Sequence, residues 1–219
     1  MANPANTTLA QERAVFAAHR SPRIIAFALL VAVVVRLAAG GYERADLVVV
    51  AVILGLEPLT EWLIHVLLLH FRPRQVGRLR LDPFVARKHR AHHADPRDRE
   101  LVFVPPRVLV VILPIAAVAF PLLLPTPRLG ATAAVTSFAM LLTYEWTHHL
   151  IHSTYKPRRR YYRSIWRAHR LHHFRNEHYW FGVTVNLADH VLRTFPDRDA
   201  VPVSATARTL GVSDASPAA

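Results

Sequence analysis

Long runs of apolar residues separated by short polar segments dominate the hydrophobic pattern of the chain. Four runs, residues 24–39, 47–69, 108–124 and 129–151, approach or reach the roughly 20 residues that a helix needs to cross a bilayer core about 30 Å thick. A glycine-containing turn separates the first two runs, and a Pro-Thr-Pro segment separates the last two. The pattern therefore predicts an all-α membrane protein with four transmembrane helices in two helical hairpins.

Composition and charge support this interpretation and give it an orientation. Hydrophobic residues make up 52% of the chain, and 27 Lys and Arg against 15 Asp and Glu give a net charge of +12. The basic residues crowd into segments 72–107 and 156–175, whereas the predicted hairpin tips carry only Arg44 and Arg128. By the positive-inside rule, both termini and the large loops face the cytoplasm.

A cleaved signal peptide and a nucleic-acid-binding domain both fit these features less well. The first run has small residues near its end, as a signal peptide would, but Arg36 interrupts it. The basic segments adjoin apolar runs and are interleaved with histidines, so they do not form the separate basic domain expected for nucleic-acid binding. A short chain rich in Arg and Ala, without organelle signals, suggests a bacterial plasma membrane.

The polar segments between the runs complete the predicted domain. We expect one membrane-embedded domain over residues 1–195, with a cytoplasmic helical cap formed by 70–107 and 152–195. Residues 196–219 are polar and rich in Ala, Thr, Ser and Asp, with no clear apolar face, which predicts a disordered tail.

The candidate chemistry lies in ten of the chain's 14 histidines, which form four clusters. Residues three or four apart share a face of a helix, so each HxxHH triplet and the third cluster could direct imidazoles toward one point. The first pair is five apart, roughly 140° around an ideal helix, so the helix is expected to end or bulge there. In chain order the clusters are His65 and His70; His89, His92 and His93; His148 and His152; and His169, His172 and His173.

The clusters also repeat within the chain. The segment ARKHRAHH at 86–93 resembles WRAHRLHH at 166–173, and Glu-Trp precedes the first histidine pair much as it precedes the second. Two such halves predict two metal ions with about five imidazoles each. An all-nitrogen set suits iron, copper, nickel or zinc and does not suit calcium or magnesium.

Carboxylates are spaced to support these ligands. Glu61 lies four residues before His65 and Glu145 three residues before His148, so both are candidates to orient imidazoles from outside the metal sites. An alternative for both is pairing with cytoplasmic Arg. Glu57 precedes Pro58, so a role at a helix kink is as well supported as a role beside the metal ligands. The four histidines outside the clusters are not assigned as ligands: His19, His149, His178 and His190.

In pattern, spacing and membrane context, the segments HVLLLH, HRAHH, HHLIH and HRLHH resemble the fatty acid hydroxylase superfamily, which includes fatty acid 2-hydroxylases and sterol desaturases. The resemblance runs from about Glu57 to Pro196 and includes HHFRNEHYWFGVT with the following Asp189 and Thr194. It implies a cytoplasmic dimetal centre on four transmembrane helices, two iron ions on the ten clustered histidines, Asp189 in support, O2 as co-substrate and a lipid substrate. Zinc could replace iron in purified protein.

The expected function is therefore O2-dependent oxidation of a membrane lipid, with hydroxylation of an acyl chain preferred. Oxidation or desaturation of a sterol-like or carotenoid substrate is the alternative within enzymes, and a membrane metal transporter or metal-binding protein is the alternative outside them. Without cysteine the chain cannot hold a thiolate iron–sulfur cluster or c-type haem. Electrons would come from an external donor, such as a cytochrome b5-like protein or a ferredoxin with its reductase.

Overall fold

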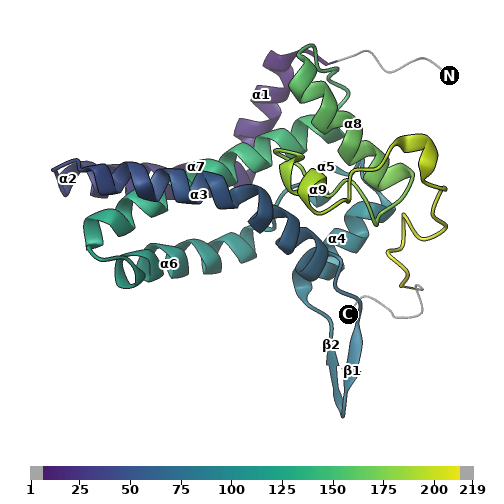
Figure 1. The fold of residues 1–219 in the computed structure, drawn as a ribbon, viewed down its shortest axis with the longest axis horizontal. Helices are drawn as coiled ribbons and strands as arrows, with labels where there is room; N and C mark the ends of the chain where they lie inside the picture. The colour runs from purple at the N-terminus through teal and green to yellow at the C-terminus, as the bar shows by residue number, and fades with distance from the viewer. Residues whose placement is uncertain (1–6, 213–219) are drawn as a thin grey trace. The chain divides into compact units, whose positions relative to one another are not determined.

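The computed structural model describes residues 7–212, which are mostly helical, and they divide into two compact units. We call residues 8–57 and 103–147 the apolar unit, and residues 58–102 and 148–212, with Thr7, the histidine unit. Helices α3 (Arg44–Leu63) and α7 (Pro127–His152) contribute residues to both. Figure 1 shows the elements of each unit along the chain.

The apolar unit is built from long helices. Besides its parts of α3 and α7 it contains α1 (Leu9–Ala18), α2 (Arg20–Ala38) and α6 (Pro106–Leu123). Gly130 of α7 allows a close approach to α6, because a Cβ there would lie 2.4 Å from backbone atoms of Pro121. The core residues come from α2, α6 and α7: Ile25, Ala32, Leu109, Leu113, Ala134 and Phe138.

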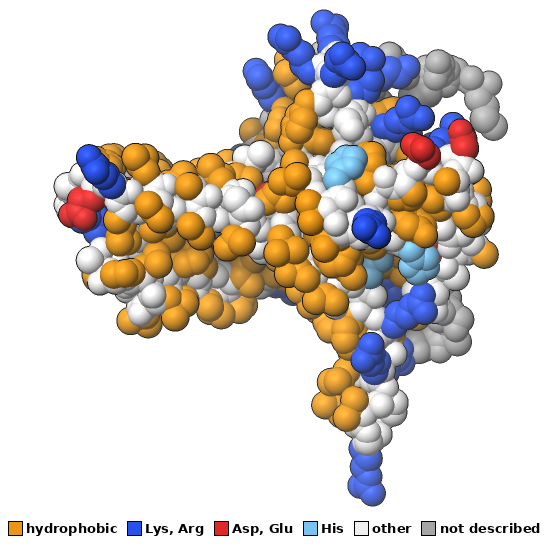
Figure 2. Space-filling view, in the orientation of Figure 1, with side chains coloured by type: hydrophobic (Ala, Val, Ile, Leu, Met, Phe, Trp, Pro, Cys, Tyr) orange, Lys and Arg blue, Asp and Glu red, His pale blue; other side chains and the backbone are white. Residues whose placement is uncertain are grey.

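Large apolar side chains also cover the outside of these helices. Leu30 is 60% exposed, Leu47 71% and Leu122 77%. Figure 2 shows hydrophobic side chains over much of the visible surface of these helices. Contiguous apolar surface of this kind is unusual on a soluble protein and is expected where lipid is the solvent.

Three helical segments within residues 7–212 are long and apolar enough to cross a membrane: Arg20–Ala38, Arg44–Leu69 and Arg99–Leu123. They correspond to the first three predicted runs and are consistent with an integral membrane protein. The fourth run, 129–151, lies in α7 and is not among them, because threonines and Glu145 interrupt its apolar residues. The four-span arrangement stays a prediction.

A buried polar cluster joins three helices of the apolar unit. Arg36 of α2 donates to Asp46 of α3 at 2.9 Å and to the hydroxyl of Thr132 of α7 at 2.7 Å. The same hydroxyl donates to Asp46 at 2.6 Å. Arg36, which interrupts the first apolar run in the sequence, is thus satisfied by charge and hydrogen bonds, as a buried cation requires.

The histidine unit contains shorter elements. Residues Ile64–Leu69 continue α3 as a π-helix, η1, and an antiparallel hairpin follows, with β1 (Arg74–Val76) paired to β2 (Leu79–Leu81). The remaining elements are α4 (Phe84–Ala94), α5 (Arg99–Val102), the end of α7, α8 (Arg160–Phe174), α9 (Leu187–Val191) and the 3₁₀ helix η2 (Arg198–Ala200).

The segment after Pro196 differs from the predicted disordered tail as far as residue 212. Val201 is 3% exposed and packs with Ala168 and Trp180, and Leu210 is also 3% exposed. The backbone N–H of Ser204 donates to the carbonyl of Arg175 at 2.7 Å. Val201, Ala207 and Leu210 are therefore buried individually, whereas Val203 is exposed, so the segment lacks the periodic apolar face that a sequence pattern detects. Residues 213–219 lie outside the described residues.

Candidate metal centre

A π-bulge brings the first histidine pair together. Over Ile64–Leu69 the helix widens, and the N–H of His70 donates to the carbonyl of His65 at 3.0 Å, five residues back. A wider turn places residues five apart nearly one above the other, and such bulges are frequent at functional sites. The two imidazole centroids are 5.0 Å apart. The predicted interruption of the helix is confirmed.

The two HxxHH triplets do not each point to one place. In α4, His89 and His93 direct their rings to one group of histidines, and His92 directs its ring to another. In α8, His169 and His173 join the group of His92, and His172 joins the other. Residues four apart stay on one stripe of a helix, whereas the residue at the third position is rotated away from that stripe. Each triplet therefore serves both groups.

All ten predicted histidines lie in the histidine unit and fall into two groups of five, in each of which one ring nitrogen per residue lies within 4.8 Å of the others. The two groups are adjacent, since the ring centroids of His93 and His173 are 4.1 Å apart. We call the first group site A and the second site B. Site A consists of His65, His70, His89, His93 and His172, and site B of His92, His148, His152, His169 and His173.

Backbone carbonyls fix the orientation of three imidazoles in site A. Each places Nδ1 against a carbonyl oxygen, so Nδ1 carries the hydrogen and Nε2 of the neutral ring carries a lone pair. The pairs are His65 with Phe181 at 2.6 Å, His172 with Tyr179 at 2.8 Å and His93 with Ala207 at 2.8 Å.

This assignment leaves lone pairs facing each other. The Nε2 atoms of His93 and His172 are 3.2 Å apart, and Nε2 of His89 is 3.2 Å from that of His93. Since the carbonyl bonds make both His93 and His172 acceptors at Nε2, no hydrogen bond can join these two atoms in the neutral state. Two lone pairs this close repel each other, so a cation between them would stabilise the arrangement.

Burial opposes a proton in that position. It lowers the pKa of His93 to about 4, and it lowers the pKa of His89 and His172 well below the ordinary histidine value, with neighbouring imidazoles adding to the effect. A metal ion fits better. Nitrogens about 2.1 Å from a shared ion and about 90–110° apart would be about 3.0–3.4 Å from each other.

Site B repeats this spacing. The Nε2 atoms of His92 and His152 are 3.2 Å apart, and those of His169 and His173 are 3.1 Å apart. Burial lowers the pKa of His92, His169 and His173 well below the ordinary value, so these rings are also neutral near pH 7. Both donor sets therefore suit a transition metal that accepts imidazole nitrogen.

Glu61 and Asp189 hold the loop that carries two of the carbonyls. Glu61 accepts hydrogen bonds from the backbone N–H of Val183 and from both the N–H and the hydroxyl of Thr184. Asp189 accepts from the N–H of Phe181 at 3.0 Å and of Gly182 at 2.7 Å. Gly182 has no room for a side chain, because a Cβ would lie 2.4 Å from the carbonyl oxygen of Val185. The carboxylates thus reach the imidazoles through the loop.

Glu145 is placed differently from the expectation. Its carboxylate accepts from the hydroxyl of Ser21 and the N–H of Val104, each at 2.9 Å, within the apolar unit. The nitrogen of His148 instead bonds the carbonyl of Val102 at 2.9 Å. A spacing of three residues predicts a shared helix face, but it does not tell which neighbour the carboxylate contacts.

The four histidines left unassigned lie outside both groups. His19 accepts from the N–H of Ser21 at the start of α2 and stacks on Phe103 with centroids 3.9 Å apart. His190 contacts the ring of Phe195, His178 is exposed, and His149 is buried. Two further groups at site A were not predicted from the sequence: the ring of Phe181, whose centroid lies 5.3 to 5.6 Å from those of three site A histidines, and the carbonyl of Ala207.

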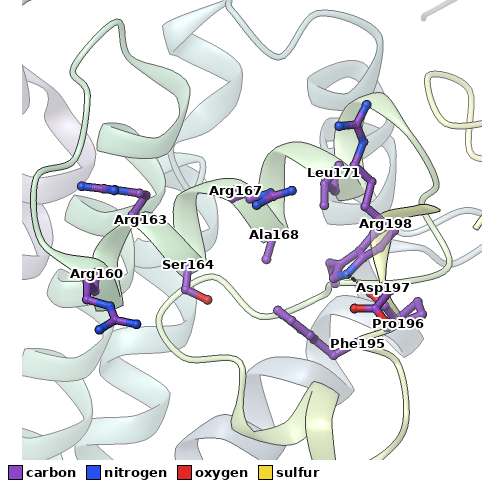
Figure 3. Close-up of a pocket in the computed structure, with 11 residues that line it drawn as sticks. Arg160, Arg163, Ser164, Arg167, Ala168, Leu171, Phe195, Pro196, Asp197 and Arg198 are labelled. Atoms are coloured by element: carbon purple, nitrogen blue, oxygen red, sulfur yellow. Dashed lines mark hydrogen bonds between the residues drawn. The ribbon is translucent and has the colours of Figure 1, made fainter. Parts of the chain in front are cut away.

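Two cavities lie in the histidine unit. One, of about 450 Å³, reaches site A through His70. The other, of about 400 Å³, lies on the face of α8 opposite its histidines and is drawn in Figure 3. Arg160, Arg163 and Arg167 extend along one side of it, and Phe195 lies across from them. Neither cavity is lined by a histidine of site B.

The chain is similar in sequence to known proteins. The fatty acid hydroxylase family matches residues 50–194. Fatty acid 2-hydroxylase of Homo sapiens is 28% identical over 137 residues, covering 62% of this chain and 36% of that protein. Dihydroceramide fatty acyl 2-hydroxylase of Arabidopsis thaliana is 31% identical over 112 residues, covering 49% of this chain and 45% of that protein. This chain thus spans less than half the length of these curated relatives.

A solved structure shows the same fold. Full-length Scs7p, of which only the hydroxylase domain is visible, superposes with a TM-score of 0.63 at 22% identity, covering 83% of this chain and 66% of that one. The sequence match covers well over half of the chain and includes all ten histidines of sites A and B. The chain belongs to the fatty acid hydroxylase family, as its histidine pattern predicted.

Proposed function

We propose that this chain uses O2 and two iron ions, one in site A and one in site B, to hydroxylate a fatty acyl chain of a membrane lipid. The observation that carries the proposal is the pair of adjacent five-imidazole groups, buried and neutral, in a fatty acid hydroxylase. Relatives named as 2-hydroxylases point to the carbon next to the acyl carbonyl as the position attacked.

The overall reaction needs a reductant as well as O2. One oxygen atom enters a C–H bond and the other leaves as water, which consumes two electrons and two protons. Bound iron supplies the redox chemistry that activates O2, whereas zinc on the same ligands is redox-inactive. We infer a cytochrome b5-like protein or a ferredoxin with its reductase as the electron donor, because these 219 residues, without cysteine, hold no thiolate iron–sulfur cluster or c-type haem of their own.

The chain's own residues position the reaction and limit access to it. The carbonyls of Tyr179, Phe181 and Ala207 keep Nε2 of their imidazoles directed inward, and Glu61 and Asp189 hold the loop behind two of these carbonyls. The gathering of all ten imidazoles into two compact groups within one unit favours a fixed cofactor over a path for metal transport. Preorganised ligands of this kind lower the reorganisation that chemistry would otherwise require.

Membrane placement follows from the same sequence features. We propose that residues 129–151 of α7 form a fourth span and that sites A and B face the cytoplasm, where the positive-inside rule places the arginine-rich segments. Residues 1–195 would then act as one membrane-embedded hydroxylase, in a bacterial plasma membrane. Site A begins at the end of the span Arg44–Leu69, so its metal would lie at the membrane boundary.

Lipid analysis of cells that express the protein tests this function. With ¹⁸O2 supplied, the wild type should produce 2-hydroxy fatty acids that carry one labelled oxygen, and His172→Ala and His173→Ala should produce none. Labelled products confined to sterol-like or carotenoid lipids would favour the alternative substrate. No labelled lipid from iron-loaded protein with a competent donor would contradict the proposal.

A further inference from the structure

The cavity of about 450 Å³ beside site A connects the candidate metal centre with the surface. His70 belongs to site A and also lines this cavity, and its Nε2 is buried without a hydrogen-bond partner among residues 7–212. The ring of Phe181 lies against His70, with centroids 5.6 Å apart, and forms another part of the wall. A ligand in the cavity would therefore lie next to the metal position of site A.

Apolar residues from a membrane span line the same cavity. Val66 and Leu67 belong to η1, the last turn of the span Arg44–Leu69, and Leu210 also contributes to the lining. Leu67 is 63% exposed, so this wall continues onto lipid-facing surface. An acyl chain could follow this wall from the bilayer into the cavity and gain contact with apolar side chains.

Two arginines give the cavity a positive end. Arg72 and Arg74 follow the span by three and five residues, where the headgroups of a bilayer lie, and both line the cavity. Neither forms an ion pair within the part of the chain that the structure describes. The guanidinium of Arg74 lies over the ring of Phe71 at 5.5 Å, and that of Arg72 packs against Gly211, where a Cβ would be 2.9 Å from Nη2.

The nearby carboxylate forms no ion pair with these arginines within the described residues. Glu177 lines the cavity, but it is 1% exposed, accepts a hydrogen bond from the hydroxyl of Thr206 and lies 3.5 Å from Nε2 of His178. Two guanidinium groups beside an apolar wall are suited to an amphiphile with an anionic head, because each can form charge-assisted hydrogen bonds to a carboxylate or phosphate.

We propose that Arg72 and Arg74 bind the anionic head of an acyl lipid, and that this contact places the first carbons of the chain beside site A. The inference rests on the proposed function and specifies its substrate class. The head site and His70 line one cavity, so the carbon atoms nearest the head are the ones that reach the metal position. The same contact would explain hydroxylation at carbon 2.

Direct binding tests the head site without catalysis. Zinc-loaded wild-type protein in neutral detergent is titrated with palmitic acid, with its methyl ester and with dipalmitoyl phosphatidic acid. At least one anionic lipid should bind about tenfold or more tightly than the uncharged ester, as expected for charge-assisted hydrogen bonds. A preference for palmitic acid identifies a free fatty acid as the substrate source, and a preference for phosphatidic acid identifies a phospholipid.

Matched variants locate the head site. R72Q/R74Q should lose this preference and leave binding of the methyl ester within about threefold. R72K/R74K should retain part of it, because an ammonium group keeps the charge but not the paired hydrogen bonds of a guanidinium. Two controls should bind like the wild type: R78Q, at the tip of the same hairpin, and R163Q/R167Q, in the other arginine-lined cavity. Two zinc ions per chain in each variant would show that the sites remain folded.

The outcomes separate this inference from the proposed function. The head site would be overturned, even if hydroxylation is observed, by any one of three results. These are an unchanged preference in R72Q/R74Q, loss of preference in R163Q/R167Q, or equal binding of acid and ester by the wild type. If zinc-loaded R72Q/R74Q fails to fold, equal binding of anionic lipid and methyl ester by R72K/R74K would also overturn it. Arginine-dependent acid binding without any hydroxylated product would support the head site and contradict the hydroxylase function alone.

Discussion

Sites A and B each contain five imidazoles, but these are held in different ways. In site A, three rings donate Nδ1 to backbone carbonyls that lie beyond α8 in the chain. In site B, His148 bonds the carbonyl of Val102 in the segment before α6, and Nδ1 of His92, His169 and His173 is buried with no hydrogen-bond partner within residues 7–212. His152 also has a backbone hydrogen bond to Pro96. Site A is thus held by three carbonyls that follow α8, and site B by two groups that precede α6 and by the packing of α4, α7 and α8.

Sites A and B also differ in their surroundings. The loop of site A is braced by Glu61 and Asp189, and its His70 faces a cavity that reaches lipid-exposed surface. Supporting hydrogen bonds raise the basicity of a ligating imidazole and fix its tautomer. We therefore expect site A to meet the substrate and to be the more easily perturbed, and site B to be the more robust ion site.

Removing one ligand from either site should have the largest effect. His172→Ala in site A and His173→Ala in site B should each lower hydroxylation by about a thousandfold or more, because the two ions act as a unit. His19→Asn, which keeps a hydrogen-bond acceptor at the start of α2, should retain full activity. Product formation is measured by mass spectrometry of extracted lipids. Near-normal activity in either alanine variant would contradict a reaction that needs both sites.

Shortening the C-terminal segment should separate the sites. A chain that ends at Pro202 lacks the Ala207 carbonyl on His93 and the Leu210 side chain beside His70. We expect iron affinity at site A to fall about 10–100-fold, as is usual when a group that hydrogen-bonds to a metal ligand is lost. The iron affinity of site B should change little. The iron bound per chain, measured at a series of buffered free-iron concentrations, gives the affinity of both sites. A chain that ends at Val212 is the control, and equal loss from both sites would contradict the asymmetry.

Glu61→Gln should weaken site A with a smaller structural change. The amide oxygen can still accept from the N–H groups of Val183 and Thr184, but these hydrogen bonds lose their charge assistance, and the Thr184 hydroxyl must turn to accept from the amide NH2. Iron affinity at site A should fall about tenfold or more, whereas Glu145→Gln should leave iron content at both sites unchanged and lower only stability. Parallel iron titrations of the two variants decide this, and loss of iron in Glu145→Gln would restore its predicted ligand-orienting role.

Acid should destabilise the metal-free protein gradually. The folded-state pKa of His93 is lowered to about 4 by burial, below the ordinary value near 6.5, so the unfolded chain binds protons first as pH falls. This contribution to stability is complete above about pH 6.5 and is lost toward pH 4, by up to about 1.4 kcal/mol per pH unit for each such histidine. Unfolding in detergent at pH 7.5 and 5 measures the loss, and equal stability at both pH values would contradict burial of neutral imidazoles.

The sequence predicted the local features of this protein better than its long-range contacts. Periodicity and run length predicted the apolar helices, and the five-residue interval between His65 and His70 predicted the bulge that the π-helix supplies. The repeat of the histidine triplets predicted two groups of about five. These features depend on residues within a few helical turns of each other, where geometry follows directly from spacing.

The division of each triplet between sites A and B could not be predicted in this way, because it depends on how α4 and α8 face each other. The carbonyl of Ala207 carries no side-chain signal, and residues 197–212 have too few apolar positions for a periodic pattern. Glu145 shows the same limit, since its partners Ser21 and Val104 are 124 and 41 residues away in sequence. Only packing determines which of several nearby polar groups a side chain contacts.

The most direct test is the iron content of protein purified anaerobically with iron supplied. Wild type should bind about two ions per chain, and His172→Ala and His173→Ala should each bind about one, since each removes a ligand of a different site. Loss of both ions from His172→Ala alone would show that the sites are not separate. No metal in the wild type would contradict the dimetal centre on which the proposed function depends.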